Sequence, residues 1–104
     1  MGKFVLVYSG GGIPESEEQQ ASVMAEWGAW YGKMGEAIVD PGNPFAASKQ
    51  VSDKGVSDGS ASSTPATGYT IISADSLDEA TAKVQDHPHL KHDGQVSVYE
   101  TFKM

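Results

Sequence analysis

Three segments of the chain carry the apolar patterns of β-strands. Residues 3–9 and 68–74 have apolar side chains on both alternating faces, which is typical of central strands covered on two sides. Residues 95–102 alternate instead, with Val96 and Val98 on one side and polar or aromatic residues on the other. The first two segments are therefore predicted to lie in the middle of a sheet. The third is predicted to form a strand with one face less exposed to water than the other.

Two further segments repeat apolar residues every three or four positions, which predicts amphipathic helices. One covers residues 16–37, and the other begins at Ser76 and ends before Pro88, because the residue preceding a proline resists the helical conformation. Each opens on a serine followed three residues later by Gln or Glu, which is the pattern of a capping box. The residues expected to face inward are Val23, Trp27, Trp30, Met34 and Ile38 in the first helix, and Leu77, Ala80 and Val84 in the second.

The first predicted helix contains three glycines, Gly28, Gly32 and Gly35, whose spacing places them along one side. Each glycine inside a helix costs about 1 kcal/mol relative to alanine. We expect a contact that compensates for this cost, and interpret this side of the helix as one that packs closely against another backbone.

The segment between the first helix and the second apolar strand is polar and rich in turn residues. Residues 40–44, Asp-Pro-Gly-Asn-Pro, are expected to end the helix. Residues 45–56 are a weaker strand candidate, with isolated valines among polar residues as in an edge strand. Residues 57–67 are low in complexity and are expected to form the flexible tip of a long hairpin within a single domain, residues 1–104.

The order strand, helix, strand, strand, helix, strand indicates an α+β protein of the ferredoxin-like βαββαβ class. Its antiparallel sheet is expected to carry both helices on one face, with the first and third strands in the centre. Both central strands are apolar on the opposite face as well. Because a second subunit can cover such an exposed apolar face, we expect a homodimer.

The composition of the chain limits the classes of molecule that we expect it to bind. The chain has 104 residues, enough for one core, and a net charge of −7, and its basic residues are all lysines. Nucleic acids and anionic membranes are recognised through positive surfaces, so neither is expected as a partner. No stretch approaches the roughly 20 apolar residues that cross a membrane, and there is no cysteine. We therefore expect a cytoplasmic protein.

The second central strand leads into a recognisable motif, Asp-Ser-Leu-Asp-Glu-Ala at residues 75–80. Together with Trp-Gly-Ala-Trp at 27–30, Val-Asp-Pro-Gly-Asn-Pro-Phe at 39–45 and His-Pro-His-Leu at 87–90, it resembles the YCII-related family. The resemblance implies a dimeric ferredoxin-like α/β barrel with a cleft beside the partner subunit. It also implies a His–Asp pair as the proposed catalytic group, and in one branch the dehydrochlorination of an aromatic substrate. That branch carries its histidine on the first helix, and residues 16–37 here contain none.

His87 is the first candidate for proton chemistry, because an imidazole titrates near neutral pH and a carboxylate such as Asp40 can orient it. The predicted catalytic pair is therefore His87 as general base and Asp40 as its orienting partner. The alternative is structural, because His87 follows the second helix and can cap its C-terminus. The two interpretations differ in whether His87 lies within hydrogen-bonding reach of Asp40 in a cavity.

Aromatic residues are the candidates for binding a ligand. Trp27, Trp30 and Tyr69 can form the wall of a pocket, since aromatic rings stack on flat apolar molecules. Asn43 and His89 are the predicted polar contacts. The alternative for the tryptophans is core packing at helical spacing.

All three histidines lie within residues 87–93, a segment that offers ligands of the kind that bind zinc or copper. Their spacing matches no standard closed motif, and we expect neither a metal nor another cofactor. Because some proteins of this fold bind haem, a haem-dependent monooxygenase is an alternative.

These residues favour an acid–base enzyme of lyase or isomerase type that acts on a small cyclic metabolite in a cleft of the dimer. The alternative is a non-catalytic dimeric binding or accessory module, whose cleft holds a small molecule without transforming it. The substrate itself has no signature in the sequence.

Overall fold

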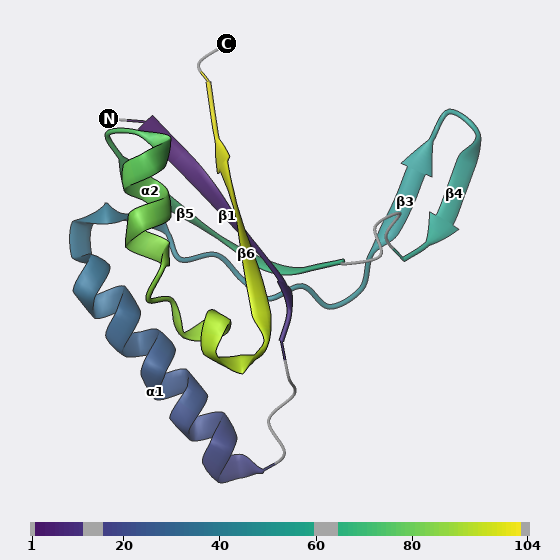
Figure 1. Ribbon diagram of the computed structural model, residues 1–104. Coiled ribbons are helices and arrows are strands. Elements are labelled where there is room, and N and C mark those ends of the chain that lie inside the picture. The colour runs from purple at the N-terminus through teal and green to yellow at the C-terminus, as the bar shows by residue number, and fades with distance from the viewer. Residues whose placement is uncertain (1, 12–15, 60–64, 103–104) are drawn as a thin grey trace.

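The structure is a computed structural model that describes residues 2–11, 16–59 and 65–102 (Figure 1). Its element order confirms the predicted succession of strands and helices, with one additional hairpin. None of the helices in these three ranges is long and apolar enough to span a membrane. The strands are β1 (Gly2–Gly10), β2 (Ile38–Asp40), β3 (Lys49–Ser52), β4 (Gly55–Asp58), β5 (Ala66–Ala74) and β6 (Gly94–Glu100); the α-helices are α1 (Glu17–Met34) and α2 (Leu77–Val84), and the short 3₁₀ helices are η1 (Gly35–Ala37) and η2 (Pro88–His92).

Four strands form one antiparallel sheet in the order β2-β5-β1-β6. Leu6 in β1 lies opposite Thr70 in β5 on one side and opposite Val98 in β6 on the other. The two segments that are apolar on both faces are thus the central strands, as predicted. This arrangement is the ferredoxin-like fold, and the predicted fold class is confirmed.

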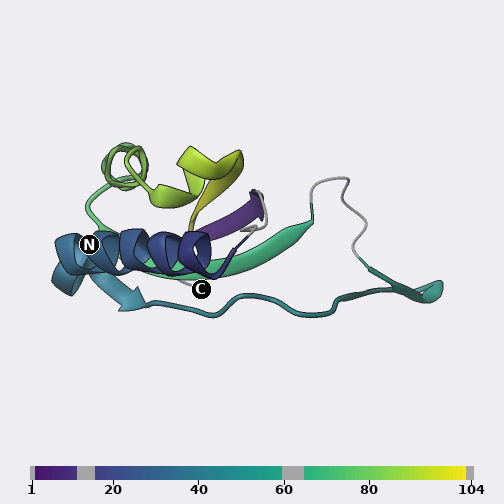
Figure 2. The same cartoon turned by 90° about the horizontal axis from the view of Figure 1, so that it is seen from below.

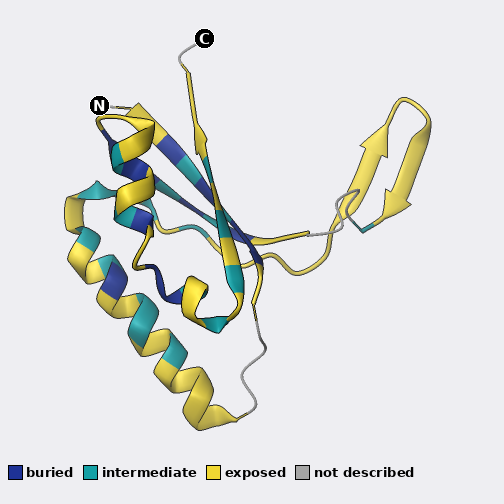
Figure 3. Cartoon of the chain, viewed as in Figure 1, coloured by how far each residue is buried: buried dark blue, intermediate teal, exposed yellow. Residues whose placement is uncertain are grey.

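The core lies between the sheet and the two helices, which cover the same face. Every second residue over most of β1 points to this side and is buried, because successive side chains of a strand alternate between faces. Figure 3 shows the buried residues along the sheet and on the inner sides of the helices. The core consists of Phe4, Leu6, Tyr8, Ile72 and Ala74 from the sheet, with Trp30 from α1 and Ala80 and Val84 from α2.

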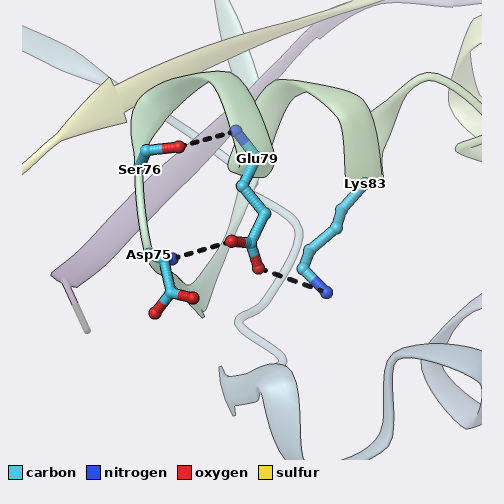
Figure 4. A network of polar contacts seen from close by, with 4 residues as sticks. All are labelled: Asp75, Ser76, Glu79 and Lys83. Atoms are coloured by element: carbon cyan, nitrogen blue, oxygen red, sulfur yellow. Dashed lines mark hydrogen bonds and ion pairs between the residues drawn. The ribbon is translucent and has the colours of Figure 1, made fainter.

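Both helices begin at the predicted capping serines. The Oγ atoms of Ser16 and Ser76 each accept a hydrogen bond, 3.1 Å long, from the backbone N–H three residues further on. In α2, Glu79 also accepts a hydrogen bond from the backbone N–H of Asp75 and pairs with Lys83 at 3.9 Å (Figure 4). These contacts satisfy backbone donors that the first turn of a helix leaves unpaired, which fixes where α1 and α2 begin.

Two details of the helices differ from expectation. α1 ends at Met34 and continues only as the 3₁₀ turn η1, because Gly35 adopts a φ of 55° that α-helical residues do not take. Leu77, expected on the inner side of α2, is 40% exposed because it is the first residue of the helix.

The strand next to β5 at the sheet edge is β2, and the predicted edge strand over residues 45–56 is wrong. β2 has only three residues, because the turn that begins with Pro41 and Gly42 interrupts the pairing after Asp40. A single bridge between Pro44 and Gly68 follows, and the chain then leaves the sheet.

Residues 49–58 form a separate two-stranded hairpin, here called the arm. Its strands turn at residues 53–54, and its register places Val51 opposite Val56. The helices lie on one side of the sheet and the arm stands out on the other (Figures 1 and 2). Of the expected flexible tip at residues 57–67, residues 57–58 belong to β4 and residues 66–67 to β5, whereas residues 60–64 lie outside the described residues.

The close packing expected at the helix glycines is absent from the described part of the chain. A Cβ atom added at Gly28, Gly32 or Gly35 would meet no neighbouring atom within 4 Å. These glycines lie on the exposed side of the segment, so the described residues supply no contact that compensates for their cost.

The face of the sheet opposite the helices is not covered by any helix of the described residues. Val5, Val7 and Ile71 point to this side, and Tyr99 on β6 is 58% exposed there. Tyr69 alternates with the inward-facing residues of β5 and belongs to the same side. We call this surface, formed by these five residues, the uncovered face.

The core packing predicts a clear difference between two leucines. Leu6→Ala removes a fully buried side chain and should lower the free energy of unfolding by about 2–5 kcal/mol. Leu77→Ala makes the same change at an exposed position and should cost less than about 1 kcal/mol. Urea denaturation of both variants at one protein concentration measures the two values, and equal costs would contradict the assignment of the core.

Candidate functional site

A cavity of about 1170 Å³ opens between α1, η2, the turn at residues 41–44 and the beginning of β5. Tyr8 lines it from β1, and Trp27 and Tyr31 line it from α1. Tyr69 lies at its sheet edge, so the cavity reaches the border of the uncovered face. The polar side chains that line it are Gln19, Ser22, Glu26, Asn43, Thr67, His89, Lys91, His92 and Asp93.

Three of these rings form what we call the aromatic wall. Trp27 stands edge-on to Tyr8, with ring centroids 4.9 Å apart, and its ring lies 6.2 Å from that of Tyr31. Trp27 and Tyr31 are one helical turn apart, so both rings project from the same side of α1. An apolar surface of this kind suits a flat ligand.

His89 lines the cavity with its ring held in one orientation. Its Nε2 lies 2.8 Å from the carbonyl oxygen of Ser9, and because a carbonyl only accepts, Nε2 carries the proton and donates it. No described residue hydrogen-bonds Nδ1, so the neutral ring presents a free acceptor there. The ring fits because Gly11 and Gly94 have no side chains: a Cβ atom at these positions would come within 2.8 and 2.3 Å of the imidazole.

His87 lies behind the aromatic wall in the core, with no exposed surface. Its Nδ1 accepts a hydrogen bond from the backbone N–H of His89 at 3.0 Å, so its Nε2 carries the proton and donates to the Tyr8 hydroxyl at 3.1 Å. Trp27 and Trp30 enclose the ring, with centroids 4.5 and 4.3 Å away. Burial, with a smaller contribution from nearby His89, lowers the pKa of His87 to about 4.

Tyr8 continues the hydrogen-bond chain from His87 across the sheet. Its hydroxyl donates to Thr70 Oγ1 at 2.7 Å, and Thr70 donates to the carbonyl oxygen of Pro41 at 2.9 Å. Tyr31 donates to the same carbonyl at 3.2 Å. Burial raises the pKa of Tyr8 well above its usual value, so its hydroxyl stays protonated at neutral pH.

The structure does not bring His87 and Asp40 together. Asp40 accepts a hydrogen bond from the backbone N–H of Gly42 at 2.9 Å and another from the Tyr69 hydroxyl at 3.3 Å. Asp40 lies on the edge strand β2, whereas His87 hydrogen-bonds Tyr8 on β1, and β5 separates these strands. The expected hydrogen bond between the imidazole and the carboxylate is therefore not formed.

Four of the five predicted ligand-binding residues line the cavity: Trp27, Asn43, Tyr69 and His89. The fifth, Trp30, is only 4% exposed and belongs to the core, because it lies where α1 rests directly on the sheet. Core packing is thus the role of Trp30, whereas Trp27 contributes to the cavity and packs against the core as well.

The structure adds a pair of titratable residues that local sequence patterns do not indicate. Glu26 on α1 and His92 on η2 both line the cavity, with Oε1 and Nε2 3.5 Å apart. They form an ion pair when the imidazole is protonated. Only the packing of η2 against α1 brings them together, and the one local signal is the position of Glu26 directly before Trp27.

The described residues contain no group of three or more His, Cys, Asp or Glu side chains arranged as a metal site requires. The three histidines of residues 87–93 face separate groups on β1 and α1. Their closeness in the sequence therefore does not become a common ligand set in space.

Comparisons with known proteins bear on the fold. No family model matches the chain, and no curated protein matches it in sequence. The chain is similar in structure to 5-chloro-2-hydroxyhydroquinone dehydrochlorinase from Burkholderia phenoliruptrix AC1100, solved in complex with 2,5-dihydroxybenzoquinone. The TM-score is 0.56 over 97% of this chain and 93% of that chain, at 21% sequence identity. At this identity the likeness shows a common fold.

The burial of His87 predicts a pH-dependent stability. Because folding lowers its pKa from 6.5 to about 4, only the unfolded chain takes up a proton between these values. This contribution is fully present above pH 6.5 and is lost as the pH falls, so the free energy of unfolding should drop by up to about 3 kcal/mol by pH 4. Urea denaturation at several pH values measures the slope.

The control for this prediction is His87→Gln, which has no titrating ring. The variant should be less stable at pH 7 but should lose most of the slope between pH 6.5 and pH 4. A variant with the same slope as the wild type would show that other groups cause it.

Proposed function

We propose that the chain is a small acid–base enzyme of lyase or isomerase type that binds a cyclic molecule in the cavity and moves a proton on it through His89. The observation that carries the proposal is the fixed ring of His89: Nε2 is held by the Ser9 carbonyl, and Nδ1 is free to accept a proton beside the aromatic wall. A positioned imidazole in this state is the commonest general base in enzymes.

The aromatic wall supports a flat, cyclic ligand. One face of such a ring can stack against Trp27 and Tyr31, and the Asn43 amide offers both a donor and an acceptor to ring substituents. The dehydrochlorinase of similar fold was solved with 2,5-dihydroxybenzoquinone, a ring of this kind. That compound is therefore a suitable first probe for this cavity.

His87 and Asp40 take part in the proposal as positioning residues. His87 holds the backbone N–H of His89 and the hydroxyl of Tyr8, so it fixes both the base and one ring of the aromatic wall. Asp40 holds the Tyr69 hydroxyl at the sheet edge. Displacing a base by about 1 Å costs about 10²-fold in rate, so loss of either contact should reduce turnover without removing the reacting group.

A second candidate function is non-catalytic, namely a binding or accessory module that holds the same ligand. The observation that favours it is the partner of His89, a neutral backbone carbonyl. A carboxylate in that place would stabilise the imidazolium that forms when the base takes up a proton. The two functions therefore differ in whether His89 exchanges a proton with the bound ring.

Hydrogen exchange on 2,5-dihydroxybenzoquinone in D₂O separates these functions. In the proposed reaction Nδ1 first takes the deuteron of a ring hydroxyl and donates it to the neighbouring ring carbon. It then takes the proton from that carbon, and the hydroxyl oxygen regains a deuteron from the solvent. Proton NMR follows the loss of the ring C–H signal, and calorimetry measures binding in parallel. We expect the wild type to accelerate exchange and His89→Asn to reduce the rate by about 10²-fold or more, with binding retained.

The matched control is His92→Asn, the same substitution at another cavity position, which should retain most of the exchange. Binding without acceleration in the wild type would favour the binding module over the enzyme. Failure of the cavity to bind the probe would contradict its proposed ligand class.

We also propose that two copies of the chain pack through the uncovered face as a homodimer, in the manner of a dimeric α/β barrel. The support is the apolar surface of Val5, Val7 and Ile71, which no helix of the described residues covers. Membership of the YCII-related family and a cytoplasmic location belong to the same proposal. They rest on the sequence motifs and on the lack of cysteine.

The homodimer predicts that Ile71→Lys produces a monomer, because it places a charge in the middle of an apolar interface. Thr81→Lys introduces the same charge at an exposed position on α2 and should leave the dimer intact. Sedimentation velocity measures the mass of each. A wild-type protein that sediments as a monomer at high concentration would contradict the proposal.

A further inference from the structure

We propose that the arm of each copy packs against the second copy, with Val51 and Val56 inside the dimer interface. This inference rests on the homodimer proposed above and adds a second contact surface to it. The uncovered face supplies one part of the interface, and the arm supplies the other.

Within the described part of the chain, the arm lacks the contacts that ordinarily stabilise a hairpin. Its two strands have four residues each, all exposed, and they form a sheet of their own. A two-stranded hairpin is at best marginally stable in water unless it packs against further strands or a helix. Besides its backbone pairing, the described chain supplies an ion pair between Lys49 and Asp58 at 2.8 Å, whose partners are solvated. Among the described residues, none buries the side chains of the arm.

One side of the arm is apolar. Val51 and Val56 lie directly opposite each other and are 68% and 64% exposed. The neighbouring pair, Gln50 and Ser57, points to the other side because side chains alternate along a strand. A paired apolar patch on a projecting hairpin is typical of an interaction surface, whereas single exposed valines are ordinary.

The arm stands where a second copy would lie. In Figure 1 it extends on the side of the sheet away from α1 and α2, which is the side of the uncovered face. Phe45, at the root of the arm and 48% exposed, stacks on Tyr69 with ring centroids 5.8 Å apart, so aromatic surface continues from the face toward the arm. The radius of gyration is 15.0 Å, above the roughly 13 Å of a compact chain of this length.

The uncovered face is also smaller than the surface that each partner buries in a stable interface. Four strands about 4.8 Å apart, with about seven residues of roughly 3.4 Å along each, cover roughly 450 Å². A stable interface buries about 800 Å² on each partner. Packing of the arm on the second copy supplies additional apolar area, and in a symmetric dimer it does so twice.

The charge of the arm is compatible with a second copy of the chain as its binding partner. The arm carries two lysines and two aspartates, so its formal charge is zero, in a chain of net charge −7. Two acidic copies repel each other at long range, and a neutral segment can enter their interface without adding to that repulsion. A nucleic acid would instead require a basic arm.

The test compares dissociation constants of the dimer by sedimentation equilibrium. The double variant Val51→Thr, Val56→Thr keeps β-branched side chains, and hence the strand preference, but places two hydroxyls in the interface. We expect it to raise the dissociation constant about tenfold or more. Gln50→Ala, Ser57→Ala changes two residues on the other side of the arm and should leave the constant near the wild-type value.

A dimer of unchanged affinity in the Val51→Thr, Val56→Thr variant would overturn the arm contact while leaving the homodimer in place. A wild-type protein that is monomeric throughout would overturn the homodimer and, with it, the arm contact. The two failures are therefore distinguishable in one series of measurements.

Amide hydrogen exchange gives a second readout that needs no change in the arm. Residues 49–58 should exchange slowly in the wild-type dimer and close to the unprotected rate in the Ile71→Lys monomer. Equal protection in both would show that the arm is held by its own chain, and would contradict the proposal.

Discussion

The two hydrogen bonds of buried His87 hold together the parts on which the cavity depends. Nε2 donates to Tyr8 of β1, and Nδ1 accepts from the backbone N–H of His89 in η2. They fix η2 against the sheet, and η2 carries both His89 and His92 into the cavity. A buried polar group left without a partner costs about 1–3 kcal/mol, so the ring stays neutral and in one tautomer. One imidazole thereby links the stability of the fold to the geometry of the proposed base.

Most of the fold follows from local patterns because the elements that define it are long and periodic. Apolar residues on both faces identify β1 and β5 as central strands, and Ser16 and Ser76 identify the helix starts. The edge strand was not predictable in the same way, since β2 has three residues and follows the apolar stripe of the preceding helix without a break. Its pairing depends on the free edge of β5, which is a property of the assembled sheet. The arm was missed for a related reason, because its valine pair forms only within the hairpin itself.

Residues that line the cavity wall could be predicted from the sequence, whereas the arrangement of its titratable groups could not. Their aromatic rings singled out Trp27 and Tyr69 as candidates, and the turn at residues 40–44 contains Asn43; all three line the cavity. The direction of a histidine ring after a helix end has no sequence signal. The fold turns His87 into the core, and His89, two residues further on, faces the cavity between two glycines. Contacts between distant residues, such as Glu26 with His92, exist only once η2 packs against α1.

The tautomers of the two central histidines are the most direct measure of this arrangement. Long-range ¹H–¹⁵N NMR of the imidazole rings at pH 7 distinguishes a protonated from an unprotonated nitrogen. The structure predicts a neutral His87 with its proton on Nε2, and the same Nε2–H tautomer for the neutral ring of His89. A His87 ring protonated on both nitrogens, or a neutral His89 with its proton on Nδ1, would contradict the linked network and the proposed base.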